Sequence, residues 1–133
     1  MVNIICGPKG SGKTKQIIDQ ANAAAEKAKG NVIFITKSKT YSVNINFDVK
    51  CVYTDEYGID SIDSFRGFIN GAAAANYDLE YVFIDGIARI TKADLSELES
   101  IFISASKLND INFTFTISST KEELPDYLRK FCL

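Results

Sequence analysis

Short apolar runs alternate along the chain with longer segments in which apolar residues recur every three or four positions. The runs predict buried β-strands, and the recurring spacing predicts amphipathic helices. The expected strands are Val2–Cys6, Val32–Thr36, Val49–Thr54, Glu80–Asp85 and Ile111–Ser118. Because strands alternate with helices, the expected fold is α/β: a three-layer α/β/α sandwich around a mostly parallel five-stranded sheet.

Four helical segments are expected from apolar spacing and from residues that cap helix ends. Their starts are placed at Lys13, at Asp60 or Ser61, at Thr91 with Asp94 as a capping-box-like pair, and at Ser119 with Glu122. The polar segment Lys37–Lys50 carries alternating apolar residues such as Tyr41 and Val43. Two interpretations of it stay open, an exposed edge strand or an extended loop.

The overall composition narrows the class of protein. Its 133 residues, 46% hydrophobic and 24% charged, are typical of one globular domain that spans residues 1–133. No apolar run approaches the roughly 20 residues that cross a bilayer, so no membrane partner is expected. A net charge of −2 argues against a nucleic-acid partner. The start of the chain lacks a secretory signal pattern, so a cytoplasmic location is expected.

Histidine is absent from the chain, and the three cysteines show no CxxC spacing. The first fact excludes Ser-His and Cys-His nucleophilic sites and histidine general bases. The second argues against a zinc site and against a disulfide framework. Cys6 and Cys51 lie in apolar runs, where we expect them to act as small, reduced, buried hydrophobes.

One segment carries a complete chemical motif. Residues 7–14, Gly-Pro-Lys-Gly-Ser-Gly-Lys-Thr, fit G-x-x-x-x-G-K-[ST], between an expected strand and an expected helix. The glycines Gly7, Gly10 and Gly12 let the backbone wrap around phosphate groups without a Cβ in the way. Backbone N–H groups and the helix N-terminus then attract the anion. We expect the whole segment to bind phosphate: Gly7, Pro8, Lys9, Gly10, Ser11, Gly12, Lys13 and Thr14.

With this motif the chain resembles the P-loop nucleoside triphosphate hydrolases in a minimal, single-domain form. In that resemblance residues 7–14 are the Walker A motif, and Tyr81–Asp85 is the Walker B motif, which ends in an aspartate. The resemblance implies that Lys13 neutralises the γ-phosphate and that Thr14 and Asp85 hold Mg²⁺. ATP and Mg²⁺ are therefore the expected cofactors.

Within this superfamily the chain is most similar to the RecA-like, additional-strand class. That class would insert Ile111–Ser118 between the strands Val2–Cys6 and Glu80–Asp85, although its alternating threonines fit a doubly buried strand poorly. The class often has a catalytic glutamate after the Walker B aspartate, where this chain has Gly86. Either hydrolysis is slow, or another carboxylate such as Asp55 or Glu56 polarises water or contacts a second substrate.

Three further groups are candidates for roles near the phosphates. Arg89, just after the Walker B aspartate, could act as an arginine finger, in cis or across a dimer. The polar run Ser118–Thr120 is either a γ-phosphate sensor or a helix N-cap. The run Thr91–Asp94 matches the guanine-reading T-K-x-D pattern, but it lies six residues after Asp85 at an expected helix start. ATP is therefore favoured over GTP.

The main functional hypothesis is a Mg-ATP-binding protein with weak or partner-stimulated ATPase activity, which acts as a switch or as part of an assembly. A small-molecule kinase of the nucleoside-kinase type is the enzymatic alternative, with Asp55 or Glu56 positioning the acceptor hydroxyl. A nucleotide-gated interaction module without turnover is the non-enzymatic alternative. The segment Lys37–Asp48, a protein partner or a second copy of the chain would then supply specificity.

Overall fold

The computed structural model of the chain describes residues 1–39 and 44–133. Within the described residues, five strands and five α-helices follow one another, and the short 3₁₀ helices η2 and η3 lie between them. In order they are β1 (Val2–Gly7), α1 (Lys13–Lys27), β2 (Asn31–Thr36), β3 (Lys50–Tyr53), η2 (Thr54–Tyr57), α2 (Ile62–Ala75), β4 (Leu79–Ile84), α3 (Ile87–Thr91), η3 (Leu95–Glu97), α4 (Glu99–Lys107), β5 (Asn112–Ser118) and α5 (Asp126–Arg129). All five expected strands are therefore confirmed, and each of their ends lies within one residue of the expected position.

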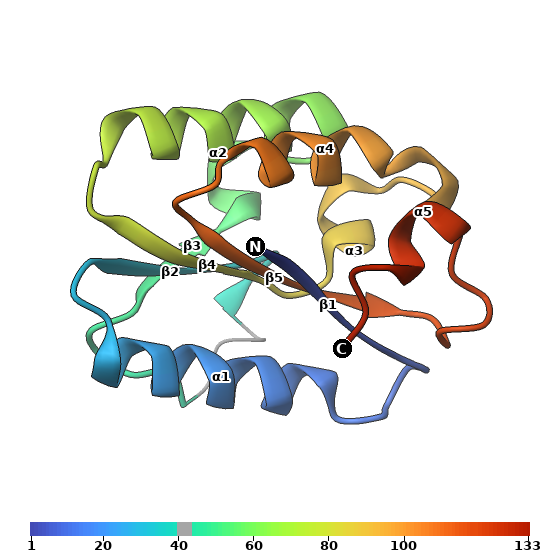
Figure 1. Cartoon of the computed structure of the whole chain (residues 1–133), viewed down its shortest axis with the longest axis horizontal. Helices are drawn as coiled ribbons and strands as arrows, with labels where there is room; N and C mark the ends of the chain where they lie inside the picture. Colours follow the sequence, from blue (N-terminus) through green and yellow to red (C-terminus); the bar gives the residue numbers. More distant parts are fainter. Residues whose placement is uncertain (40–43) are drawn as a thin grey trace.

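The strands form one sheet in the order β1-β5-β4-β2-β3, and every neighbouring pair is parallel. The expected five-stranded parallel sheet is confirmed. So is the expected place of the last strand, because β5 lies between β1 and β4 (Figure 1). This order brings the carboxyl ends of β1, β5 and β4 side by side at one end of the sheet.

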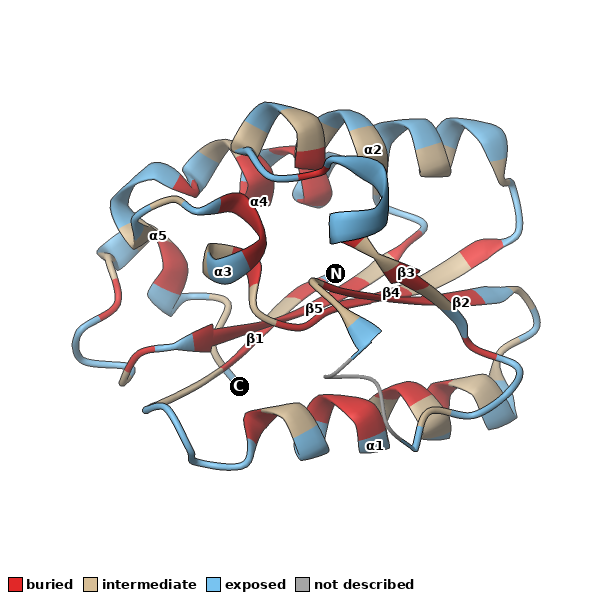
Figure 2. Cartoon of the chain, turned by 180° about the vertical axis from the view of Figure 1, so that it is seen from behind, coloured by how far each residue is buried: buried red, intermediate tan, exposed pale blue. Residues whose placement is uncertain are grey.

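Helices cover both faces of the sheet, which gives the three layers. Helix α1 lies alone on one face, hereafter the α1 face, while α2, α3, α4 and α5 lie on the opposite face (Figure 1). A small buried cluster that includes Ile17, Phe34 and Phe83 joins α1 to the sheet. A larger cluster, with Phe102 and Phe115 among its members, fills the opposite face. In Figure 2 the buried residues accordingly follow the strands and the sheet-facing sides of the helices.

Strand β5 explains how alternating threonines fit a central strand. Phe113, Phe115 and Ile117 point into the larger cluster, and Thr114 and Thr116 point to the α1 face. Thr114 is only 7% exposed and Thr116 only 2% exposed. The expectation that such threonines fit a doubly buried strand poorly is wrong here, because hydrogen-bond partners satisfy the Thr116 hydroxyl within the fold.

The last residues of the chain lie beside the first strand. The Ile4 N–H donates to the Phe131 carbonyl at 2.8 Å, and the Leu133 N–H donates to the Ile4 carbonyl at 3.0 Å. Cys132 forms a parallel bridge to Ile4 between these two bonds. The final residues thereby satisfy backbone groups on the open side of β1, which is one way to protect an edge strand.

Helix starts were predicted with mixed success. Helix α1 begins at Lys13 as expected, and Ser61 caps α2 through a capping box with Ser64. The pair of Thr91 and Asp94 is wrong as a helix start. Thr91 is the last residue of the short helix α3, and its hydroxyl donates to the Ile87 carbonyl at 2.8 Å.

The capping box near α4 lies one turn later than expected. Asp94 pairs with Glu97 in it and opens η3, and α4 begins only at Glu99. The last helical segment also differs from its prediction. The capping pair there is Thr120 with Glu123 instead of Ser119 with Glu122, and it closes a turn. The helix α5 starts after Pro125.

The segment Lys37–Lys50 is described in part, since Tyr41 and Val43 lie outside the described residues. Its described residues before Lys50 form turns and loop, and Lys50 itself begins β3. The side chain of Asn22 on α1 fixes this loop: it donates to the Asn44 carbonyl at 3.0 Å and accepts from the Asn46 N–H at 2.7 Å. The loop interpretation therefore holds for the described part.

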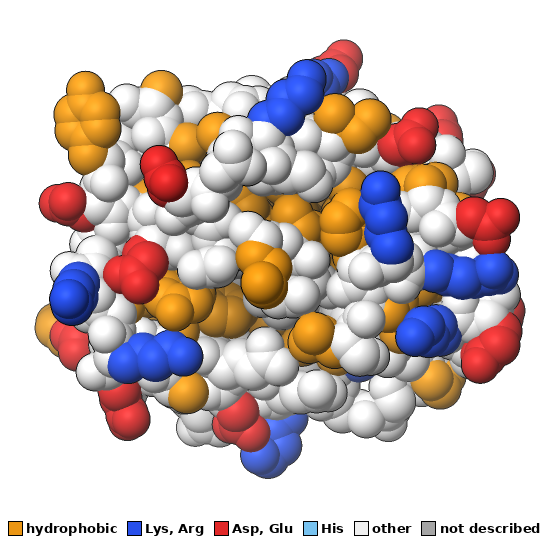
Figure 3. Space-filling view, viewed as in Figure 1, with side chains coloured by type: hydrophobic (Ala, Val, Ile, Leu, Met, Phe, Trp, Pro, Cys, Tyr) orange, Lys and Arg blue, Asp and Glu red, His pale blue; other side chains and the backbone are white. Residues whose placement is uncertain are grey.

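Two surface properties bear on possible partners. Among the helices of the described residues, none combines the length and apolar character needed to cross a membrane. Acidic and basic side chains are interspersed on the face drawn in Figure 3, without a continuous basic patch on that face. The expectation that nucleic acid is not a partner stays a prediction.

Candidate phosphate and metal site

The glycine-rich loop connects the end of β1 to the start of α1. Gly10 has φ 83° and Gly12 has φ 88°, values that favour glycine over residues with a side chain. A Cβ at either position would meet no atom within 4 Å. Glycine is therefore favoured there by the backbone conformation, and not by a lack of room for a side chain. At Gly7 a Cβ would lie 2.6 Å from the Ser11 Oγ, and rotation of that serine side chain would relieve the contact. Positive φ on both sides of Ser11 is the backbone alternation found in anion-binding nests, and the Ser11 N–H itself donates to the Pro8 carbonyl at 3.2 Å.

Lys13 lies folded over this loop and is only 9% exposed. Its Nζ donates to the Pro8 carbonyl at 2.9 Å and approaches the Ser11 Oγ at 3.5 Å. Burial lowers the pKa of the Lys13 ammonium; the nearby Asp85 carboxylate opposes that shift and Arg89 adds to it. An anion in the loop would add negative charge beside this ammonium and oppose the effect of its burial.

Asp85 follows β4 directly and is only 2% exposed. Two hydroxyl groups hold its carboxylate: the Thr14 Oγ1 donates to Oδ2 at 3.1 Å, and the Thr116 Oγ1 donates to Oδ1 at 2.7 Å. The Thr116 hydroxyl also accepts the Gly86 N–H at 2.8 Å, so it fixes the backbone after the carboxylate as well. Residues far apart in the sequence are thus brought together at one end of the sheet.

Gly86 and Arg89 form the other side of the site. Gly86 has φ 81°, and a Cβ there would lie 2.7 Å from the Arg89 Cζ, so the arginine packs on a bare backbone. The Arg89 guanidinium is 3.9 Å from the Asp85 Oδ2, in an ion pair in which the arginine side chain is 37% exposed. A glutamate at position 86 would need the same positive φ and would displace Arg89.

These groups surround one cavity of about 270 Å³. Its lining is Lys9, Gly10, Gly12, Lys13, Thr14, Asp85, Gly86, Arg89, Thr116 and Ser118. Pockets that enclose a whole small molecule usually measure about 300–1,000 Å³. A cavity of this size therefore suits part of a ligand, such as its phosphate groups, with the remainder outside it.

No model of a known protein family matches the sequence, and no curated protein matches it significantly. The functional assignment of the chain therefore rests on the residues and geometry of the site itself.

Most of the predicted site residues meet in this cavity. Lys13, Thr14, Asp85 and Arg89 all line it, and so does Ser118 from the predicted polar run. The next two residues of that run do not. Ser119 forms a bridge to Gly7, and Thr120 closes a turn.

Asp55 and Glu56 lie elsewhere. Both are exposed in η2, at the end of the edge strand β3, and neither lines the cavity. The strand order separates β3 from β4 by one strand and from β1 by three, which amounts to about 10 Å and about 19 Å across the sheet. A catalytic role for Glu56 stays a prediction that this placement does not favour.

Thr116 is a site residue that was not predicted from the sequence. The sequence shows that it alternates with Phe115 and Ile117, but only the pairing of β5 with β4 places its hydroxyl beside Asp85. The polar position itself was the available clue, because a threonine in a central strand of a parallel sheet needs a buried partner.

The donor atoms of the site are hard oxygen ligands. Thr14 offers a hydroxyl and Asp85 a carboxylate, which are groups that Mg²⁺ binds while it keeps several water molecules. Within residues 1–39 and 44–133 there is no cluster of three or more His, Cys, Asp or Glu that could enclose a metal ion. These residues therefore fit a metal that phosphate oxygens and water also coordinate, and do not fit an all-protein metal cage.

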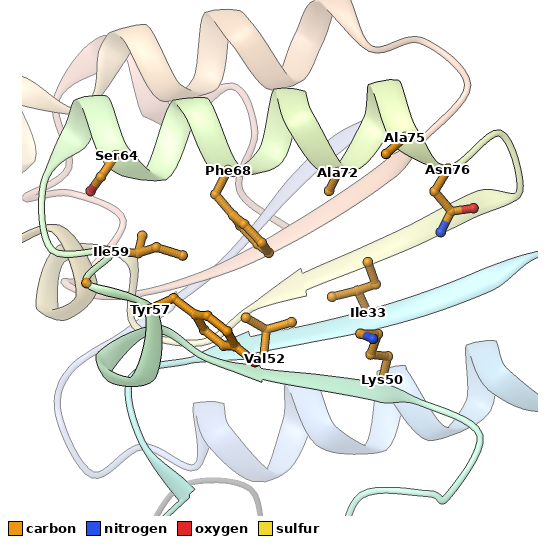
Figure 4. Close-up of a pocket in the computed structure, with 11 residues that line it drawn as sticks. Ile33, Lys50, Val52, Tyr57, Ile59, Ser64, Phe68, Ala72, Ala75 and Asn76 are labelled. Carbon is orange, nitrogen blue, oxygen red and sulfur yellow. The ribbon is translucent and has the colours of Figure 1, made fainter.

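The largest of the described cavities lies away from this site. It measures about 640 Å³ and is mostly apolar, between β2, β3 and α2 (Figure 4). Ile33 and Val52 form its floor, and Phe68 and Ala72 of α2 form its roof. Titratable groups are few there, with Lys50 and Tyr57 at the rim. Its composition suits packing against apolar groups better than it suits phosphate chemistry.

Proposed function

We propose that this chain is a P-loop NTPase that binds a nucleoside triphosphate together with Mg²⁺. Residues 7–14 would bind the phosphates, and ATP is the preferred nucleotide over GTP. The single observation that carries the proposal is the convergence of Lys13, Thr14 and Asp85 in one cavity. A glycine loop alone could be a simple turn. Here the Lys13 ammonium and the hydrogen-bonded pair of Thr14 and Asp85 line the same cavity, which combines a cation for phosphate with oxygen ligands for a metal ion.

In this proposal each residue has a defined task. The N–H groups around Gly10 and Gly12 and the Lys13 ammonium bind the phosphate oxygens. The Thr14 hydroxyl and the Asp85 carboxylate hold Mg²⁺, which would neutralise charge on the β- and γ-phosphates. Thr116 keeps the Asp85 carboxylate in place, and Arg89 stands at the edge of the cavity, where it can reach a phosphate.

We further propose that hydrolysis by the isolated chain is slow and that a protein partner or a second copy of the chain stimulates it. Asp85 is the only carboxylate in the described lining of the cavity, and two hydroxyls already occupy it. No second carboxylate is therefore placed there to activate a water molecule. The chain would act as a nucleotide-dependent switch or assembly component.

Thermal unfolding with and without nucleotide tests the binding proposal. Mg-ATP at about 100 times its dissociation constant should raise the free energy of unfolding by about 2.7 kcal/mol. Lys13→Ala should abolish this stabilisation. Lys15→Ala is the matched control, because Lys15 is an exposed lysine whose ion-pair partner among the described residues is Asp19, on the outside of α1. Equal stabilisation of the wild type and Lys13→Ala would refute the assignment.

Turnover then separates the functional alternatives. We expect phosphate release far below one per second by the chain alone, because the cavity lacks a base for water. Phosphoryl transfer from ATP to a small hydroxyl compound that disappears in Glu56→Gln would favour the kinase alternative. Tight binding with no release of phosphate, even with candidate partners, would favour the interaction module.

A further inference from the structure

Two threonines flank Asp85 at the same level of the sheet. The register pairs Ile84 with Phe115 on one side and with Ile35 on the other, so the residues that follow these three form a row: Thr116, Asp85 and Thr36. The Asp85 N–H donates to the Ile35 carbonyl at 2.9 Å, which extends the pairing of β4 with β2 to this level. Ile35, Ile84 and Phe115 all point to the opposite face, so the three residues of the row share the α1 face.

The two threonines differ in their hydrogen bonds. Thr116 donates to Asp85 and accepts from the Gly86 N–H. The Thr36 side chain is fully buried, yet its Oγ1 has no hydrogen-bond partner within the described residues. A buried hydroxyl without a partner costs about 1–3 kcal/mol, and valine would fill the same space without that cost. The Thr36 side chain neighbours the buried carboxylate of the site but lies outside the described lining of the cavity, so its hydroxyl gains a partner only if side chains rotate when the ligand binds.

Geometry limits what that partner can be. Neighbouring strands are about 4.8 Å apart, so a single water molecule can bridge a hydroxyl on β2 and a carboxylate after β4. Mg²⁺ keeps several waters when one or two carboxylates and phosphate oxygens bind it. Groups that hydrogen-bond such waters orient them and raise the affinity of the site for the metal.

We propose that Thr36 is a positioning residue of this site, whose hydroxyl binds a water molecule in the coordination shell of the Mg²⁺ ion that Thr14 and Asp85 hold. The inference rests on the proposed function, because it assumes that the ligand of the site is a metal–nucleotide complex. It adds a residue from β2 to a site otherwise built from β1, β4, β5 and the loops that follow them.

The test compares ATP affinity in excess MgCl₂ with ATP affinity in EDTA. For the wild type, Mg²⁺ should increase the affinity. In Thr36→Val we expect this Mg²⁺-dependent increase to shrink about 10-fold, while the affinity in EDTA stays unchanged. Thr36→Ser, which keeps the hydroxyl, should retain the increase. In addition, Thr36→Val should have a higher melting temperature without ligand, since it removes an unpartnered buried hydroxyl.

Thr54→Val is the matched control. Thr54 is also fully buried with an unpartnered hydroxyl, but it begins η2 after the edge strand β3, so the strand β2 separates it from Asp85. Its substitution should leave the Mg²⁺-dependent increase intact.

The outcomes separate the inference from the function on which it rests. A wild type that does not bind ATP in either buffer refutes the proposed function. A wild type whose ATP affinity Mg²⁺ leaves unchanged refutes the metal role of the site, and Thr36 with it. A wild type that responds to Mg²⁺, together with a Thr36→Val variant that responds equally, refutes the role of Thr36 alone. A loss of ATP affinity in EDTA also contradicts that role, because the hydroxyl would then act without the metal.

Discussion

The two faces of the sheet differ in what they bury. On the opposite face, under α2, α3, α4 and α5, the strands present almost only apolar side chains, and the aromatic rings of Phe102 and Phe115 lie 4.5 Å apart. On the α1 face the apolar cluster is smaller, and the carboxyl ends of β5, β4 and β2 present threonines and an aspartate. One strand can therefore serve both purposes, since successive side chains point to opposite faces.

Because the two faces differ in this way, substitutions on one face should change mainly the stability of the fold, and substitutions on the other should change mainly the affinity for the ligand. Residues of the opposite face contribute the transfer free energy of large apolar groups. Residues of the row on the α1 face contribute hydrogen bonds and charge that the ligand would use. A substitution that changes both properties to a similar extent would argue against such a division.

The largest effect is expected from Phe115→Ala. Phe115 is fully buried on the opposite face, so its truncation should lower the free energy of unfolding by about 3–5 kcal/mol. Urea denaturation measures this loss. The affinity of the remaining folded protein for Mg-ATP should change little. A loss of affinity larger than the loss of folded protein would show that the two faces do not have separate roles.

Thr116→Val on the same strand should behave in the opposite way. It leaves the Asp85 Oδ1 and the Gly86 N–H without the hydroxyl that both use, so a loss of about 1–3 kcal/mol in stability is expected. The Mg²⁺-dependent increase in ATP affinity should fall with it, as titration in MgCl₂ and EDTA would measure. Thr114→Val, two residues earlier on the same face, is the control and should leave that increase intact.

A smaller and favourable effect is expected on the outer surface of α2. Gly67 and Gly71 are exposed within this helix, and a Cβ at either position would meet no atom within 4 Å. Each Gly→Ala change should raise the stability by about 1 kcal/mol, because alanine loses less backbone entropy on folding. Calorimetry should show the higher melting temperature with the same ATP affinity. Gly86→Ala is the contrasting case, where positive φ and the Arg89 side chain should make the change destabilising.

The smallest effect is a pH dependence that comes from Lys13. Burial lowers the pKa of this ammonium from 10.5, so the unfolded chain holds the proton up to a higher pH than the folded chain. The stability of the ligand-free wild type relative to Lys13→Ala should therefore rise as the pH approaches 10.5. Denaturation curves of both proteins at several alkaline pH values would show it. A difference that is flat or falling would mean that the buried ammonium is not destabilised.

Lys15 provides the internal contrast for that measurement. Its hydrogen bond with Asp19 raises the pKa of the Lys15 ammonium, so its contribution to stability should be lost as the pH rises. The stability of the wild type relative to Lys15→Ala should then change with the opposite sign.

The sequence predicted the strands well because the buried strands of a parallel sheet are nearly continuous apolar runs, as Val32–Thr36 and Glu80–Asp85 are. It also predicted the loop residues Lys13 and Thr14, since the motif, its strand and its helix are contiguous. Local patterns were less reliable at helix ends. A Ser, Thr or Asp three residues before an acidic residue occurs at several places around residues 91–97 and 119–123, and only the folded backbone selects one pair.

The resemblance gave the place of β5 in the sheet, but the register between distant strands could not be derived from the sequence. Thr116 and Thr36 matter because of the register of β5 and β2 against β4, and hydrophobic periodicity does not give register across a parallel sheet. The placement of Glu56 was misleading for the same reason. It does lie at the carboxyl end of a strand, but the strand order puts that end at the edge of the sheet farthest from the loop.

The shared level of Thr116, Asp85 and Thr36 has a consequence for how related sequences could diverge. Side chains alternate along a strand with a period of two. One inserted or deleted residue within β2, β4 or β5 would therefore make that strand's polar residue of the row point into the apolar core, and a core residue point toward the site. Insertions in the loops beyond the carboxyl ends of these strands would leave the row unchanged. We therefore expect evolution to tolerate length changes after Lys37 but not between Val32 and Thr36, and random single-residue deletion libraries should show the same boundary.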